Sequence, residues 1–251
     1  MTETQSDTSP PIGAPSVDEN RQSSSTANRD VAAQLAVVQS QLAAAMAQRP
    51  SHYAANPVTL VAVSKRQPDA KIDAILAAGQ RVFGENRVRE ASQRWTDRRL
   101  FYSDIKLHLV GPLQTNKVAE AVALFDVIEV VDREKLARAL ATEMTRQNRN
   151  LPCYIQVNTG EEPQKSGILP DQLESFTHFC KNELALPITG LMCIPPVDEE
   201  AAMHFALLNR MAQRLNVPKL SMGMSEDYIE AIGFGATSVR VGSAIFGKRE
   251  N

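Results

Sequence analysis

Two hydrophobic patterns alternate along most of this chain. Short runs that are mostly apolar and rich in β-branched residues occur, for example, at residues 59–65 and 127–131. Each run is followed by a segment in which apolar residues recur every three or four positions, which is the pattern of an amphipathic helix. Runs that are apolar on both faces are typical of buried parallel strands, and parallel strands are usually connected by helices. The pattern therefore predicts strands that alternate with helices.

Eight such strand-and-helix units follow one another, and eight parallel strands are the number that closes a (β/α)8 barrel, the TIM barrel. An open, doubly wound α/β sheet is the alternative. It usually carries a glycine-rich turn after its first strand, where this chain has Ser64-Lys65-Arg66-Gln67-Pro68. We therefore expect a single closed barrel. The strands are predicted at residues 58–65, 81–84, 107–110, 127–131, 153–157, 188–193, 219–221 and 237–241, and the helices at 69–78, 86–95, 115–124, 132–146, from 171, 198–215, 225–232 and 243–246.

Two segments precede the first predicted strand. Residues 1–27 are rich in Ser, Thr, Pro, Gln and Asp and lack a long apolar run, so we expect a disordered tail without a signal sequence or membrane span. Asn28 can cap an extra helix over residues 29–49, and the barrel domain is therefore predicted to cover residues 28–251. The apolar stripe of that helix consists of Val31, Leu35, Val38, Leu42 and Met46.

Composition narrows the class of protein. The 251 residues are 43% apolar and carry a formal charge of -2, which is typical of one globular domain and indicates no nucleic-acid or membrane partner. The three cysteines, Cys153, Cys180 and Cys193, are odd in number and lack metal-site spacing, so we expect neither disulfides nor a metal site. Without an export signal, the cytoplasm is the expected location, and we expect a monomer.

One lysine stands at the end of the first predicted strand. Burial lowers the pKa of a lysine, and the neutral amine can attack an aldehyde to form a Schiff base. The alternative is a lysine whose stem packs on the strand while its ammonium group reaches solvent. Lys65 is therefore the candidate reactive group.

The loops after the last two predicted strands have the composition of an anion site. In (β/α)8 barrels these two loops commonly hold phosphate. Glycine lets backbone N–H groups approach an anion, serine hydroxyls can donate to it, and helices predicted to open at Ser225 and Ser243 would add free N–H groups. The alternative for each serine is an ordinary helix cap. The candidate cradle consists of Ser221, Gly223, Ser225, Gly242 and Ser243.

Barrel closure would place the first strand beside the eighth and bring Lys65 next to this cradle. Pyridoxal 5′-phosphate (PLP) carries an aldehyde and a phosphate in one small molecule and would satisfy both features. A Schiff-base aldolase that acts on a sugar phosphate is the alternative. Such an aldolase needs acid and base groups deep in the barrel, and inward-pointing carboxylates are scarce in the predicted strands.

Arg240 bears on the chemistry that PLP would perform. It alternates with Val239 and Val241, so we expect its side chain to point into the barrel. A guanidinium group can donate to a pyridine nitrogen but cannot protonate it fully, which leaves PLP a poor electron sink. That arrangement favours racemisation or simple carriage. The alternative is a salt bridge at the strand end.

Several motifs together resemble the pyridoxal phosphate homeostasis protein family, the YggS-type proteins. The resemblance covers about residues 30–247 and rests on residues 61–65, 84–86, 108–117, 165–167, 190–192, 221–225 and 239–247. It implies a fold-type III PLP-binding barrel similar to the N-terminal domain of alanine racemase, with a Schiff base on Lys65 and the phosphate in the cradle. It also implies Arg240 near the ring nitrogen and Asn86 near the ring hydroxyl. Gly242-Ser243 stands where many members have Gly-Thr, which keeps the hydroxyl.

The expected function is therefore that of a PLP carrier. Family members are regarded as cofactor carriers or homeostasis proteins, and the chain ends at Asn251, directly after the eighth unit, without the second domain of alanine racemase-like enzymes. We expect reversible binding and delivery of PLP, with PLP-dependent apoenzymes as candidate recipients. An amino-acid racemase that takes a second base from a partner subunit is the alternative. His108 is expected to be a satisfied core histidine, and Lys117 and Lys165 to be solvated loop lysines.

Overall fold

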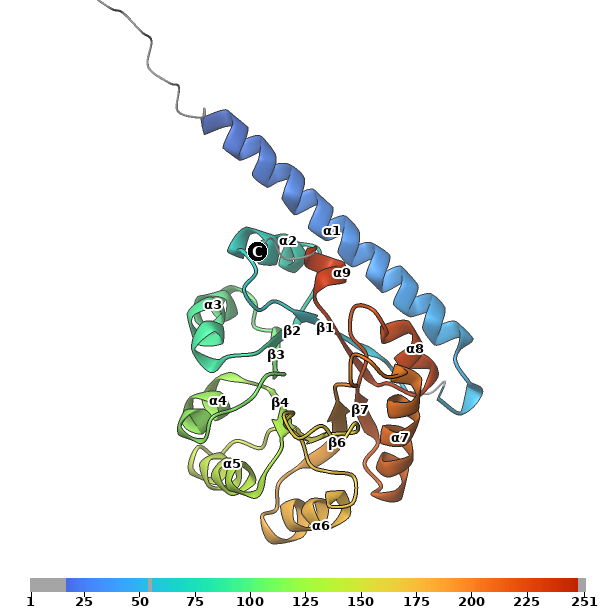
Figure 1. Cartoon of the computed structure of the whole chain (residues 1–251). Coiled ribbons are helices and arrows are strands. Elements are labelled where there is room, and N and C mark those ends of the chain that lie inside the picture. The colour runs from blue at the N-terminus through green and yellow to red at the C-terminus, as the bar shows by residue number, and fades with distance from the viewer. Residues whose placement is uncertain (1–16, 54–55, 248–251) are drawn as a thin grey trace, which may run out of the picture.

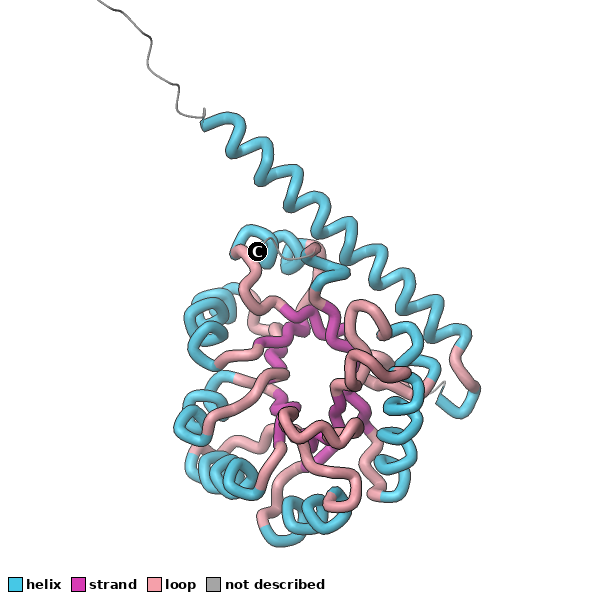
Figure 2. The backbone as a smooth tube through the Cα atoms, in the orientation of Figure 1, coloured by secondary structure: helices cyan, strands magenta, loops and turns pink. Residues whose placement is uncertain are grey.

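The computed structural model describes residues 17–53 and 56–247, and these residues form a closed barrel of eight parallel strands in sequence order. Figure 1 shows the helices arranged around the strands, and Figure 2 shows the strands as an inner ring. The predicted (β/α)8 barrel is confirmed. The strands are β1 (Thr59–Val63), β2 (Val82–Glu85), β3 (Lys106–Leu109), β4 (Val127–Val131), β5 (Cys153–Val157), β6 (Ile188–Cys193), β7 (Lys219–Ser221) and β8 (Ser238–Val241).

The helices cover the outer face of the strands. Because the strands are covered by helices on that face and by packed side chains within, residues such as Val61, Phe83, Ile155 and Val239 have no exposed surface. The helices are α1 (Val17–Gln48), α2 (Asp69–Ala77), α3 (Val88–Phe101), α4 (Val118–Leu124), α5 (Glu134–Arg146), α6 (Leu173–His178), α7 (Ala201–Arg214), α8 (Tyr228–Gly233) and α9 (Ser243–Phe246). Shorter helical turns are η1 (Ser51–Tyr53), η2 (Thr115–Lys117) and η3 (Phe179–Glu183).

Closure of the barrel joins the first strand to the last. β1 pairs with β8 in parallel, with Val61 opposite Arg240 and Ala62 opposite Val241. The carboxyl ends of both strands therefore lie side by side at one face of the barrel, where the loops meet (Figure 2). This pairing brings Lys65, after β1, next to the loops after β7 and β8, as predicted.

The extra helix α1 lies across the outside of the barrel, against α2, α8 and α9 (Figure 1). Leu35, Val31 and Val38 are buried there, as the apolar stripe predicted. The predicted start near Arg29 is wrong, because α1 begins at Val17 and so includes part of the segment expected to be disordered. Once a helix is nucleated, each added residue costs little, so polar residues extend it without an apolar stripe. Residues 1–16 of the expected tail lie outside the described residues.

Other features of the described residues concern metals, membranes and thiols. None of the described helices is both long and apolar enough to cross a membrane. In the same residues, no three His, Cys, Asp or Glu side chains lie close enough together to hold a metal ion. Cys153, Cys180 and Cys193 are buried free thiols, and burial raises the pKa of Cys193 to about 12. These thiols are therefore protonated at neutral pH and are poor nucleophiles.

Replacing Leu35 by Ala tests the packing of α1 on the barrel. Leu35 is 1% exposed, and a buried Leu→Ala change typically costs about 2–5 kcal/mol because it removes contacts and leaves a cavity. Val37→Ala is the matched control on the same helix, since Val37 is 48% exposed and should cost less than about 0.5 kcal/mol. Urea unfolding curves measure both changes. Equal midpoints for the two variants would mean that α1 does not dock on the barrel in solution.

Candidate functional site

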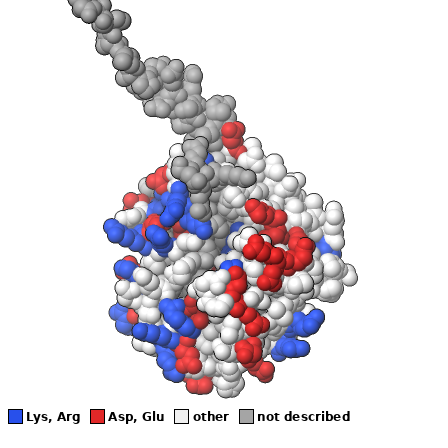
Figure 3. All heavy atoms as spheres, viewed as in Figure 1, with Lys and Arg blue, Asp and Glu red and all other residues white. Residues whose placement is uncertain are grey.

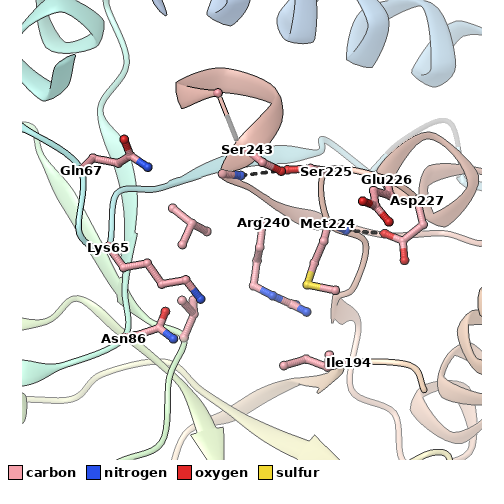
Figure 4. Close-up of a pocket in the computed structure, with 14 residues that line it drawn as sticks. Lys65, Gln67, Asn86, Ile194, Met224, Ser225, Glu226, Asp227, Arg240 and Ser243 are labelled. Carbon is pink, nitrogen blue, oxygen red and sulfur yellow. Dashed lines mark hydrogen bonds between the residues drawn. The ribbon is translucent and has the colours of Figure 1, made fainter. Parts of the chain in front are cut away.

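A pocket of about 390 Å³ opens at the face of the barrel that carries the carboxyl ends of the strands. Lys65 and Asn86 lie on one wall, Met224 and Ser225 lie on the other, and Arg240 lies between them (Figure 4). Six of the eight predicted site residues line this pocket, and the other two, Ser221 and Gly223, do not. The six are Lys65, Asn86, Ser225, Arg240, Gly242 and Ser243.

Lys65 is positioned by the residue before it. The Ser64 N–H donates to Gly84 O at 3.0 Å, and the Ser64 hydroxyl donates to Glu85 Oε1 at 2.6 Å. The buried Glu85 carboxylate also accepts from Arg94 Nη1 at 2.9 Å and from Trp95 Nε1 at 3.0 Å. The end of β1 is thereby tied to β2 and α3, and the side chain of Lys65 extends into the pocket (Figure 4). Glu85 was not assigned a role from the sequence, although it lies within the Gly84-Glu85-Asn86 motif.

Asn86 lies beside Lys65, and its position depends on a glycine. A Cβ added to Gly111 would lie 2.6 Å from the Asn86 Cα, which is closer than real contacts allow. Gly111 therefore permits the loop after β3 to pass directly over the backbone of Asn86. The glycine of the His-Leu-Val-Gly-Pro motif thus shapes the pocket wall without lining it.

The loop after β7 and the start of α9 are joined through one hydroxyl. Ser225 Oγ accepts from the N–H groups of Gly242 and Ala244, each at 3.2 Å. Because a hydroxyl has one proton, Ser225 keeps that proton for donation to a ligand. α9 begins at Ser243, as predicted. The Gly242 N–H is used in this contact, so Ser225 and Ser243 supply the hydroxyl donors along this wall of the pocket, and Gly242 lies between them without a side chain.

Two predicted features of the cradle require correction. A helix was expected to open at Ser225, but α8 begins at Tyr228, because the Asp227 carboxylate accepts from the Met224 N–H at 2.5 Å and holds a turn there. Gly223 lies behind the pocket wall rather than in it, with a φ of 92° and its carbonyl accepting from the Arg240 N–H at 2.9 Å. It anchors the loop to β8.

Ser221 and Arg240 belong to a buried network beneath the pocket. Arg240 points into the barrel, as predicted, and donates to Ser221 Oγ at 2.6 Å and to Cys193 O at 2.7 Å. Ser221 in turn donates to Glu129 Oε2 at 2.5 Å. The hydroxyl proton of Ser221 is therefore used inside the protein, and the structure does not bring Ser221 to the phosphate cradle.

Glu129 was missed from the sequence, where inward carboxylates appeared scarce. It stands alone in the apolar strand β4, and that isolated charge was the available signal. Burial raises its pKa, but the hydrogen bond and charge of His108, the charge of Arg240 and the Ser221 hydroxyl outweigh burial, so the pKa lies below the ordinary value. His108 Nδ1 lies 2.6 Å from Glu129 Oε1, so His108 is a satisfied core histidine, as expected.

Charge is unevenly distributed on the face where the pocket opens. Figure 3 shows basic atoms over α3 and α4 and acidic atoms over α8 and the loops beside it. Glu226 and Asp227 line the pocket close to Ser225. The groups that face the pocket are therefore of both signs, because Lys65 and Arg240 line it together with Glu226 and Asp227. Lys117 and Lys165 do not line the pocket, and they pair with Glu120 and Glu162.

Comparison with known proteins shows the family of this chain. The model of the alanine racemase N-terminal domain matches residues 30–250. A pyridoxal phosphate homeostasis protein of Pseudomonas aeruginosa is 40% identical over 200 residues, which are 77% of this chain and 85% of that protein. The chain belongs to the pyridoxal phosphate homeostasis protein family. Another member, from Escherichia coli K12, is 34% identical over 230 residues, or 88% of this chain and 97% of that protein.

Solved structures agree with membership of the pyridoxal phosphate homeostasis protein family. PipY of Synechococcus elongatus PCC7942 has been solved without PLP and with PLP bound. The two structures are 36% and 35% identical to this chain, with TM-scores of 0.76 and 0.73, over 86% of this chain and 100% of PipY. Alanine racemase from Bartonella henselae is 16% identical with a TM-score of 0.66, over 89% of this chain and 61% of that protein, and shares the fold.

Replacing Gly223 by Ala tests the anchoring of the loop after β7. The new Cβ would lie 2.6 Å from Ala231 Cβ and 2.9 Å from Tyr228 Cα, in addition to the cost of a positive φ, about 1–3 kcal/mol. Gly79→Ala is the matched control, because Gly79 has a φ of 95° and nothing within 4 Å of the added Cβ. We expect Gly223→Ala to lower the free energy of unfolding by clearly more than Gly79→Ala does. Equal losses in chemical denaturation would remove the steric argument.

Proposed function

We propose that this protein binds PLP reversibly through Lys65 and carries or buffers it, acting in the cytoplasm as a monomer. The observation that carries the proposal is that Lys65 and the Ser225, Gly242 and Ser243 wall face one pocket. An amine and an anion cradle so arranged suit a molecule that has an aldehyde and a phosphate. Family membership and the PLP bound to PipY support the same assignment. PLP-dependent apoenzymes are the proposed recipients.

The residues present fit PLP group by group. Ser225, Gly242 and Ser243 would hold the phosphate, Asn86 the ring hydroxyl and Arg240 the ring nitrogen. PLP would supply an aldehyde that condenses with the neutral amine of Lys65, forming a C=N double bond and releasing the carbonyl oxygen as water. Addition of water reverses the step and frees the cofactor. Reversibility is the property that a carrier requires.

Two features favour carriage over efficient catalysis. A guanidinium group such as that of Arg240 would donate a hydrogen bond to the ring nitrogen without full proton transfer. The pocket is open to solvent, since two of its lining residues, Ile194 and Met224, are more than a third exposed. Water at the site permits exchange of the cofactor and weakens the electrostatic interactions on which catalysis depends. Both features support a protein that binds and releases PLP rather than one that uses it in catalysis.

Trapping with borohydride tests the role of Lys65. Purified protein is incubated with PLP, reduced with sodium borohydride and digested, and the modified peptide is found by mass spectrometry. We expect a visible absorbance band before reduction and a stable adduct on Lys65, because reduction converts the C=N bond into a secondary amine. Lys65→Ala should lose both, whereas Lys117→Ala, which changes a lysine outside the pocket, should keep both. An adduct spread over many lysines, or retained in Lys65→Ala, contradicts the proposal.

The racemase alternative has its own test. Amino acids are incubated with PLP-loaded protein in heavy water, and exchange of the α-proton is followed by NMR. For a carrier we expect no exchange above that given by free PLP, in the wild type and in Lys65→Ala alike. Sustained exchange that disappears in Lys65→Ala would instead establish catalysis by this pocket.

A further inference from the structure

A continuous chain of hydrogen bonds runs beneath the pocket and connects five strands. It begins at His108 on β3, passes through Glu129 on β4 and Ser221 on β7, and reaches Arg240 on β8, which also donates to Cys193 O on β6. Every contact in it is between 2.5 and 2.7 Å. Glu129 has no exposed surface and Arg240 is 4% exposed. These hydrogen bonds are therefore shielded from water. Hydrogen bonds to charged groups are stronger in such buried surroundings.

The chemistry of each side chain decides which group donates and which accepts in these hydrogen bonds. An ionised carboxylate only accepts, so the Ser221 hydroxyl must donate its proton to Glu129 Oε2 and His108 must carry a proton on Nδ1. The oxygen of Ser221 is then left to accept from Arg240 Nη1, while Arg240 Nη2 is held by Cys193 O. Two fixed acceptors thus clamp one edge of the guanidinium group, and Arg240 still lines the pocket.

Charge balance requires a distant partner for Arg240. A buried cation is costly unless a counter-charge lies near it. Among the described residues, no carboxylate lies within ion-pair distance of Arg240, whose acceptors are a hydroxyl and a carbonyl group. Glu129 supplies the negative charge through Ser221, and His108 satisfies the second carboxylate oxygen. The counter-charge of Arg240 is therefore a buried carboxylate that it does not touch.

We propose that Glu129 is a positioning residue that holds Arg240 in the pocket through Ser221, and that His108 in turn orients Glu129. The proposal rests on the proposed function only where PLP is used as the probe. Glu129 does not line the pocket, so its effect on PLP would pass through Arg240. Glu129→Gln keeps the shape of the side chain but replaces one acceptor oxygen by a donor amide. The Ser221 hydroxyl is then no longer fixed as the donor to a carboxylate, and Arg240 loses its counter-charge.

A double-mutant cycle tests this dependence. The PLP dissociation constant is measured for wild type, Glu129→Gln, Arg240→Met and the double variant. We expect Glu129→Gln alone to weaken PLP binding by about tenfold, the size of one charge-assisted hydrogen bond. In the Arg240→Met background the same change should have little further effect, because the residue it positions is gone. Equal weakening in both backgrounds would show a general structural role and overturn the proposal, since independent sites add.

Two further variants keep the test decisive. Tyr154→Phe is the control, because Tyr154 is also buried in the barrel near Glu129 but makes no hydrogen bond in the network, and it should leave the dissociation constant unchanged. A loss of affinity in Tyr154→Phe as large as in Glu129→Gln would overturn the proposal. If circular dichroism shows that Glu129→Gln does not fold, Ser221→Ala, which removes the link itself, replaces it in the same cycle.

A measurement without PLP separates failure of this inference from failure of the proposed function. In ¹⁵N-labelled protein free of ligand, we expect a protected Nδ1–H proton on His108 and a slowly exchanging side-chain N–H signal from Arg240. Both signals should be lost in Glu129→Gln and kept in Tyr154→Phe. If the wild type shows them but does not bind PLP, the proposed function fails and the network stands. If the wild type binds PLP but Glu129→Gln keeps both signals, the inference fails alone.

Discussion

The pairing of β1 with β8 is the constraint on which the site depends. Lys65 comes from one end of the barrel sequence, and Arg240, Gly242 and Ser243 come from the other. Their meeting in one pocket requires that the sheet close, with Val61 opposite Arg240. In an open sheet the first and last units of the same sequence would not have to be neighbours. Barrel closure therefore contributes to function directly, as well as burying the apolar strands.

The strands could be predicted because burial on both faces leaves a plain signal in the sequence. β4, β5, β6 and β7 begin and end at the residues predicted from their apolar runs. Helix starts were less accurate, because they depend on local hydrogen bonds that an apolar pattern does not record. Asp227 accepts from the Met224 N–H and delays α8, and α1 extends to Val17 through residues without an apolar stripe. The apolar pattern of a sequence reflects how its residues pack, whereas the ends of helices are set by polar contacts.

The same distinction explains which site residues could be predicted. Lys65, Arg240 and Gly242 follow from their places at strand ends once the barrel is assumed. Ser221 was assigned to a phosphate because it is a serine in the right loop, but its actual partner, Glu129, is 92 positions away in the sequence. The hydrogen-bond partner of a hydroxyl is set by the tertiary structure and cannot be read from the neighbouring sequence. Glu85 and Glu129 were missed for the same reason, because the sequence shows a buried carboxylate without showing the donors that stabilise it.

A reversible carrier of the proposed kind must keep its shape when it is empty. Binding that also had to order the site would lose affinity to the entropy of ordering. Here the donors are held by the protein itself: Ser225 joins the loop after β7 to the N–H groups of Gly242 and Ala244, and Ser221 and Cys193 O hold Arg240. The cost of burying Glu129 and Arg240 is met inside the barrel, by mutual contacts that need no ligand. Release of the cofactor would then leave a formed pocket, ready to bind again without refolding.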